Sequence, residues 1–196
     1  MPPSDIDPLS GSRLPLLKRE DLDEAGQRAY DHASAPGRTI VGLRGPAGIH
    51  LYSTGTVGAH TTMNQYLRFD AGFDPKVREV AIMTVARQLD SQFEWAAHEP
   101  EALQVGVPAE VVDIIKNRKS TQGIDETYAA IIEFGRQMLG GNHKVDSSTF
   151  ARIKAIFGPN KLVQLVLLMG NYASTAMLLA AVDVQVPAGK PQLPTL

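Results

Sequence analysis

An uncharged stretch of 21 residues, Leu162 to Val182, limits the fold of this chain more than any other feature. It is long enough to cross a bilayer as a helix. Polar side chains interrupt it, however, and the rest of the chain is patterned like a soluble helical bundle. A helix that is apolar all round is typical of a bundle centre or a subunit interface. We therefore predict a buried or interfacial helix, no membrane contact, and a homo-oligomer rather than a monomer.

Helix signals recur along the rest of the chain, and no strand-like alternation of apolar and polar residues appears, so the predicted fold class is all-α. The capping-box spacing of Asp21 and Glu24 predicts a helix start, and Asp74-Pro75 predicts a second one. Glycine and proline predict a loop over 35–48 that could form a lid. The expected helices cover about 21–33, one or two segments within 49–69, a segment from Pro75 that includes Arg87, 91–105 with a bend near Pro100, a segment from Pro108, 125–139, 147–157 and 162–182.

The length predicts one domain. A chain of 196 residues and 21.2 kDa can bury about 70% of its open-chain surface, which is enough for a real core. We expect a helical domain over 21–183, an N-terminal arm over 1–20, and a tail over 184–196 that lies along a neighbour or stays disordered. Val-Gly-Val-Pro at 105–108 is echoed by Val-Gln-Val-Pro at 184–187, which indicates either a duplicated helical hairpin or chance.

Charge and cysteine content exclude several classes of function. Nineteen basic and 21 acidic residues leave a net charge of −2, without the basic stripe that nucleic-acid binding requires. The chain has no cysteine, which excludes a disulfide framework, a thiolate metal site and a thiol nucleophile. The first residues have neither the basic nor the apolar region of an export signal, so we expect a cytoplasmic protein.

The segment from Arg78 to His98 carries the pattern that indicates chemistry. On a helix, Ser91, Glu94 and His98 lie at i, i+3 and i+7, so they share one face. Glu79 lies on the preceding helix, and an antiparallel hairpin could bring it alongside. A carboxylate four residues from an imidazole can hold its tautomer and raise its basicity. The spacing predicts an acid–base site, although a surface Glu/His pair has the same spacing.

The pattern Glu-x11-Ser-x2-Glu-x3-His, with tryptophan directly after the second glutamate, resembles the carboxymuconolactone decarboxylase family and its alkyl hydroperoxidase D-like relatives. The peroxidase branch has two cysteines where this chain has Ser91 and Glu94, so the resemblance is to the cysteine-free branch. It extends over about 14–187. It implies an alkyl hydroperoxidase D-like helical bundle that assembles into a trimer or hexamer, with pockets near subunit contacts.

The resemblance also implies an activity. Decarboxylases of the family use neither a metal nor an organic cofactor and act on a carboxylated butenolide lactone from aromatic catabolism. The resemblance assigns proton handling to Glu94 and His98. Decarboxylation leaves an electron pair that an adjacent carbonyl can take up as an enolate. We expect charged His98 to protonate this enolate, Glu94 to orient His98, and Glu79 to be a third catalytic group.

Other residues are candidates for binding substrate. A substrate carboxylate needs a cation, and Arg44, Arg68 and Arg78 are the choices. Ser91, Trp95 and His60 could also line the pocket. Each has a plainer interpretation: Ser91 as a helix N-cap, Trp95 as core packing, and His60 as a satisfied buried histidine. Further histidines have similar interpretations, with His50 resembling His60 and with His32 and His143 expected in solvent.

Two other functions remain open at this point. The chain could be a catalytically idle member of the same fold that binds a ligand or acts as a structural oligomer. It could also be a metal-dependent enzyme with Glu94, His98 and either His60 or His50 as ligands. Nucleotide binding is not indicated, because neither glycine-rich segment follows a strand or ends in Gly-Lys-Ser/Thr.

Overall fold

The structure, a computed structural model, describes residues 5–195; residues 1–4 of the predicted arm and residue 196 of the predicted tail lie outside it. The fold is all-α, as predicted, and within the described residues β structure is limited to an isolated bridge between Asp7 and Ser12. The elements are η1 (Arg19–Asp21), α1 (Glu24–Ser34), η2 (Gly42–Arg44), α2 (Pro46–His50), α3 (Thr54–Gln65), η3 (Tyr66–Asp70), α4 (Pro75–Gln88), α5 (Gln92–Gln104), α6 (Ala109–Lys116), α7 (Glu126–Leu139) and α8 (Ser147–Ala181).

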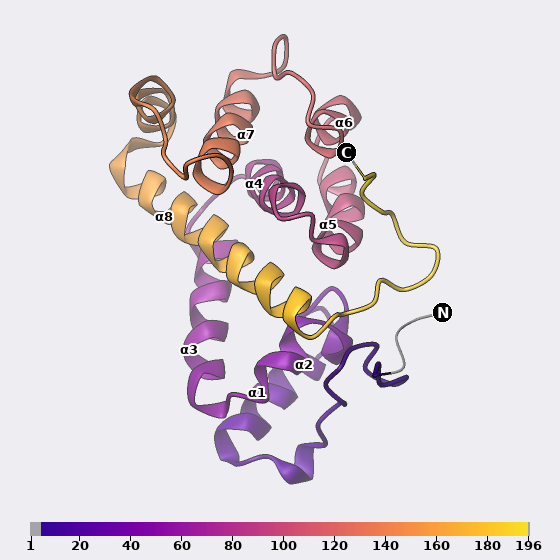
Figure 1. Cartoon of the computed structure of the whole chain (residues 1–196). Coiled ribbons are helices and arrows are strands. Elements are labelled where there is room, and N and C mark those ends of the chain that lie inside the picture. The colour runs from indigo at the N-terminus through magenta and orange to yellow at the C-terminus, as the bar shows by residue number, and fades with distance from the viewer. Residues whose placement is uncertain (1–4, 196) are drawn as a thin grey trace.

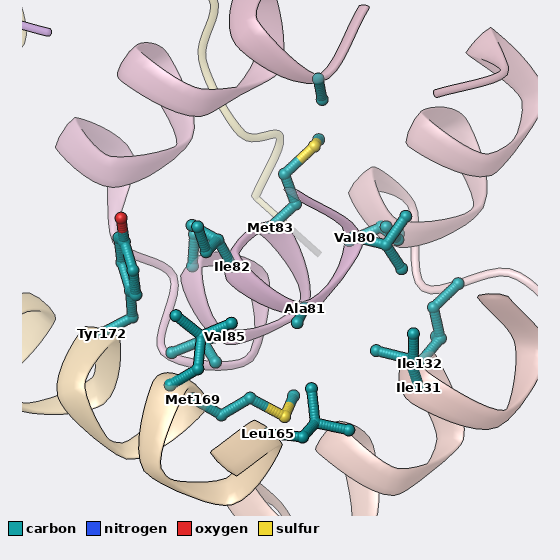
Figure 2. Packing of buried hydrophobic residues seen from close by; sticks show 14 of the residues in the cluster. Val80, Ala81, Ile82, Met83, Val85, Ile131, Ile132, Leu165, Met169 and Tyr172 are labelled. Carbon is teal, nitrogen blue, oxygen red and sulfur yellow. The ribbon is translucent and has the colours of Figure 1, made fainter. Parts of the chain in front are cut away.

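Helix α4 lies at the centre of the bundle, with α5, α6, α7 and α8 around it (Figure 1). Every residue from Glu79 to Arg87 is buried. Val85 points toward Met169 of α8, while Val80 lies on the side of α4 where Ile132 of α7 is found (Figure 2). The charged side chains of Glu79 and Arg87 are buried with the apolar ones, because this part of α4 is enclosed on all sides.

Helix α8 is broken where the sequence predicted two helices. Gly158 has φ 71° and ψ 170°, a conformation that favours glycine, and Pro159 follows it. The second part of α8 packs on α4 and α7 through Leu165 and Met169, but Val163 remains 55% exposed. This part of α8 is therefore not enclosed on all sides within the chain. Within residues 5–195, α8 alone is long and apolar enough to cross a membrane by length and composition, and 44% of its most apolar window is buried within the chain.

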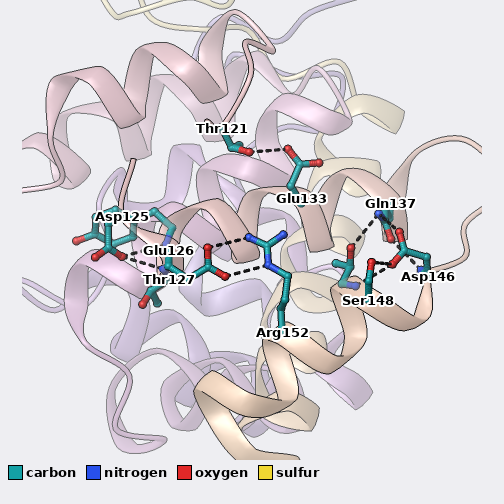
Figure 3. Close-up of polar contacts among 11 residues, drawn as sticks. Thr121, Asp125, Glu126, Thr127, Glu133, Gln137, Asp146, Ser148 and Arg152 are labelled. Carbon is teal, nitrogen blue, oxygen red and sulfur yellow. Dashed lines mark hydrogen bonds and ion pairs between the residues drawn. The ribbon is translucent and has the colours of Figure 1, made fainter. Parts of the chain in front are cut away.

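Aspartate side chains begin several helices. Asp125 accepts hydrogen bonds from the backbone N–H groups of α7, and Asp146 caps α8 while also binding Ser148 and Gln137 (Figure 3). Asp74 caps α4 as predicted. The predicted capping role of Asp21 was wrong, because Asp23 accepts from Gly26 and α1 begins two residues later than the Asp21–Glu24 box implies.

The described parts of the arm and the tail lie on the chain itself. The backbone N–H of Gln185 donates to Gly11, and that of Arg13 donates to Val182, so the two segments run together at the end of α8. Leu193 is buried, and its backbone binds the side chain of Gln92 at the start of α5. The tail therefore covers one end of the α4–α5 hairpin. The predicted duplication of a helical hairpin stays a prediction.

A close helix crossing generates a stability prediction. A Cβ atom at Gly135 of α7 would lie 2.6 Å from the Cγ2 atom of Thr84 and 2.6 Å from the Cε atom of Met169. We expect Gly135→Ala to lower the free energy of unfolding by about 1–2 kcal/mol, because overpacking outweighs the better helix propensity of alanine. Chemical denaturation measures this change.

Gly170 of α8 provides the matched control, because a Cβ atom there would meet nothing within 4 Å. Gly170→Ala should raise the free energy of unfolding by roughly 0.5–1 kcal/mol. Equal effects of the two substitutions would show that the α4–α7–α8 crossing does not have the described geometry.

Candidate active site

A cavity of about 130 Å³ lies between the α1–α3 segment and helices α5 and α8. The loop predicted as a lid contributes residues 38–42 to its wall, while η2 and α2 occupy the remainder of that loop. A cavity of roughly 150 Å³ accommodates a molecule the size of benzene. The enclosed part of this cavity is therefore suited to a ligand with a single ring.

A buried hydrogen bond connects α4 to α5 at the floor of the cavity. The Nδ1 atom of His98 lies 2.7 Å from the Oε2 atom of Glu79, and both side chains are almost fully buried. Arg78 donates to the other oxygen of Glu79 at 3.1 Å. Glu79 thus holds the His98 ring in one orientation, and its own carboxylate is held from two sides.

Glu94 approaches the opposite nitrogen of the same imidazole. Its Oε2 atom lies 3.6 Å from the Nε2 atom of His98, and both residues line the cavity. The structure therefore brings Glu79, Glu94 and His98 together, but it places the orienting hydrogen bond at Glu79. The expectation that Glu94 orients His98 was wrong, because antiparallel packing of α4 on α5 puts the shorter contact between helices rather than one turn along α5.

The pKa values of the two glutamates are shifted in opposite directions. Burial acts to raise the pKa of Glu79, but the hydrogen bond and charge of His98, together with Arg78, lower this pKa below its ordinary value. Burial dominates at Glu94 and raises its pKa, with His98 and Arg68 opposing. A pair of carboxyl groups with pKa values moved apart is typical of a site in which one group carries a proton and the other stays charged.

Tyr172 of α8 completes the floor of the cavity. Its ring meets the His98 ring edge to face, with ring centroids 5.2 Å apart. Burial raises the pKa of its hydroxyl, so the phenol stays protonated at neutral pH. Sequence reasoning missed Tyr172 as a site residue, because it lies on α8, far along the chain from the segment between Arg78 and His98.

The structure separates the three arginine candidates. Arg68 of η3 lines the cavity, and its buried Nε atom has no hydrogen-bond partner within residues 5–195. Arg78 is engaged instead, because it donates to Glu79 and to the backbone carbonyl of Arg68. Arg44 is exposed and lies beside Gly11 of the arm, outside the cavity lining. Arg38, which sequence reasoning missed, lines the cavity from the loop.

Two predicted binding residues lie away from the cavity. Ser91 occupies the N-cap position of α5, although its hydroxyl caps no backbone N–H. Trp95 is fully buried, and its indole N–H donates to Glu99 at 2.7 Å while the Lys116 ammonium lies 5.6 Å from the ring centroid. Neither side chain is among the residues that line the cavity, so the packing interpretation fits Trp95.

The histidines divide between cavity and surface. His60 lines the cavity, as predicted, and its ring stacks on that of His50. His32, which was expected in solvent, is half-buried and also lines the cavity. His143 is exposed, as expected. Across residues 5–195, no group of three or more histidine, aspartate or glutamate side chains is arranged to hold a metal ion.

The raised pKa of Glu94 predicts a pH-dependent cost of folding. The folded protein keeps the Glu94 proton to a higher pH than the unfolded chain, where the pKa is about 4.5. Stability therefore falls as pH rises above that value toward the folded-state pKa. We expect Glu94→Gln to be more stable than the wild type at neutral pH, by a margin that grows with pH across this window.

Denaturant unfolding at several pH values measures this margin. Glu110→Gln, which changes an exposed glutamate of α6, is the control and should leave the pH dependence unchanged. A Glu94→Gln variant that is less stable than the wild type at pH 7 would contradict a proton held at Glu94.

Comparison with known proteins gives one family. Residues 57–134 match the model of the carboxymuconolactone decarboxylase family. The match runs from α3 to α7 and includes Glu79, Glu94 and His98, together with His60 and Arg68. The search of curated proteins found no match.

Proposed function

Because residues 57–134 match the model of the carboxymuconolactone decarboxylase family, we propose that the protein is an enzyme that removes a carboxyl group from a small carboxylated lactone by acid–base chemistry. The observation that carries this proposal is the pair of glutamates on opposite nitrogens of the buried His98, one with a lowered and one with a raised pKa. No cofactor is included in the proposed reaction.

The reaction begins with the carbon–carbon bond to the substrate carboxylate. When this bond breaks, carbon dioxide leaves and the electron pair moves into the conjugated lactone carbonyl as an enolate. A proton must then reach the ring carbon. Burial raises the pKa of Glu94, which favours its protonated form, and Glu94 faces the cavity beside the Nε2 atom of His98. The Glu94–His98 pair therefore supplies the proton, and water restores it afterwards.

Glu79 acts through His98 in this scheme. Its carboxylate accepts from the Nδ1 atom, which leaves the Nε2 atom directed toward Glu94. A charged Glu79 also stabilises the imidazolium form of His98. Glu79 is therefore a positioning residue.

Arg68 is the proposed partner of the substrate carboxylate. It is a cation on the cavity wall with a buried, unpartnered Nε atom within the described residues, and a planar guanidinium matches a carboxylate. Its charge also lowers the pKa of Glu94 against the effect of burial, which supports a bound carboxylate on the same side of the cavity as Glu94.

Substitution of the proton-handling pair tests the function. Glu94→Gln and His98→Gln should each lower kcat for carbon dioxide release from a panel of carboxylated butenolide lactones by roughly 100- to 10,000-fold, which is the usual contribution of general acid–base catalysis. Release of carbon dioxide in a sealed cell measures the rate. Circular dichroism checks that each variant folds.

The control is Glu101→Gln, which lies on α5 outside the cavity lining and should turn over like the wild type. If no lactone of the panel is decarboxylated by the wild type, or if the Glu94 and His98 variants keep full activity, the proposed function is wrong. Ligand binding without turnover would favour the idle member of the fold.

We also propose that the protein is a homo-oligomer. Five large apolar side chains on α3, η3 and α8 are between 42% and 55% exposed: Met63, Tyr66, Phe69, Val163 and Leu167. The side chain of Gln164 donates to the hydroxyl of Tyr66, so the two groups of residues adjoin. A contiguous exposed apolar patch is typical of a protein interface.

Sedimentation velocity tests this assembly. The wild type should sediment as a multiple of 21.2 kDa, and Leu167→Glu should shift it toward the monomer, because a charge in an apolar contact lowers affinity. Phe150→Glu, at a comparably exposed position before the α8 break, is the control. A monomeric wild type would refute the proposal.

A further inference from the structure

Two stacked histidines form a part of the cavity that the proposed chemistry does not use. His50 ends α2 and His60 lies on α3, and their ring centroids are 3.7 Å apart with 25° between the ring planes. Both line the same cavity as Glu94 and His98.

Neither ring has a partner for its Nε2 atom. Both Nε2 atoms are buried and without a hydrogen bond within residues 5–195. Buried polar atoms without partners are rare in folded proteins, and each one calls for an explanation. Because these atoms belong to side chains that line a cavity, a bound ligand is the partner that would satisfy them.

The charge state of the pair limits what that ligand group can be. Burial, together with the neighbouring His60, lowers the pKa of His50 to about 4. Burial also lowers the pKa of His60, against a smaller opposing effect of the Asn171 side chain. Both rings are therefore neutral at pH 7. A neutral imidazole presents one donor and one acceptor, which suits a hydroxyl, a carbonyl or a ring oxygen better than a second carboxylate.

The pair lies at a distance from the charged end of the site. His60, Asn64 and Arg68 follow one another at intervals of four residues along α3 and η3, and all three line the cavity. Eight residues of helix span about 12 Å between Cα atoms, so the neutral pair and the Arg68 cation belong to different parts of the cavity wall. Asn171 of α8 donates to Asn64 between them.

We infer that His50 and His60 form a second, uncharged subsite that binds a neutral oxygen of the ligand while Arg68 binds its carboxylate. The inference rests on the proposed function for the carboxylate end alone. The cavity thus selects single-ring acids that carry a carboxylate at one end and an uncharged oxygen at the other.

Binding of two matched acids tests this subsite. The probes are γ-butyrolactone-γ-carboxylate and cyclopentanecarboxylate, which have rings of the same size and one carboxylate each, but only the first has neutral oxygens. Titration calorimetry on the full chain should show the wild type binding the lactone acid roughly five- to tenfold more tightly, which is the value of one hydrogen bond.

Substitutions then assign the preference to residues. His50→Phe and His60→Phe keep an aromatic ring but remove the nitrogens, and each should bring the two affinities to within about twofold. His60→Gln keeps a polar atom and should retain part of the preference, which separates the lost hydrogen bond from a change of packing. His143→Phe, at an exposed histidine, should behave as the wild type.

Arg68→Met provides the opposite pattern, because it should weaken both acids alike and leave the preference unchanged. If the preference persists in both phenylalanine variants, or if the wild type binds neither acid, the subsite is refuted. If the preference behaves as expected but no lactone is decarboxylated, the subsite stands and the proposed function fails.

Discussion

The hydrogen bond between Glu79 and His98 is the interaction on which the rest of the site depends. It joins α4 to α5 inside the bundle, where a carboxylate is stable only if it is well paired. Arg78 holds the second oxygen of Glu79 and also binds the backbone of Arg68. The same network therefore orients the imidazole and anchors the segment that carries the cavity arginine.

Enclosure of α4 makes this arrangement possible and gives the two glutamates different properties. Glu79 is compensated by a hydrogen bond and a cation, whereas Glu94 shares the same burial with only weaker compensation from His98 and Arg68. Burial without full compensation keeps a proton on a carboxyl group. Burial of Glu94 therefore lowers the stability of the folded state. The unpartnered Nε2 atoms of His50 and His60 lower it further at the same cavity.

Much of the fold could be predicted from local signals. Asp74-Pro75, Asp125 and Gly158-Pro159 mark helix ends whose causes are local, and the structure places helix boundaries there. The cap of α1 was assigned to the wrong residue, because two aspartates, Asp21 and Asp23, precede this helix. Which of them caps it depends on the tertiary structure. The apolar composition of α8 suggested that this helix lies at the centre of the bundle. The centre is instead occupied by α4, although α4 carries several charges.

The site was predictable in part, since spacing placed Glu94 and His98 on one face and named Glu79 as their neighbour. Spacing could not show which carboxylate meets which nitrogen, because that depends on how α4 crosses α5. Nor could it bring together His50 and His60, or add Tyr172 from α8, because these contacts join segments far apart in the chain.

The opposite pKa shifts of Glu79 and Glu94 are tested most directly by a carbon-13 NMR titration of their side-chain carboxyl groups, assigned with single glutamine variants. We predict that Glu79 stays ionised at a pH below the ordinary pKa of glutamate, while Glu94 keeps its proton at a pH above that pKa. Titration of both groups together near the ordinary value, or retention of the proton by Glu79 rather than Glu94, would contradict it.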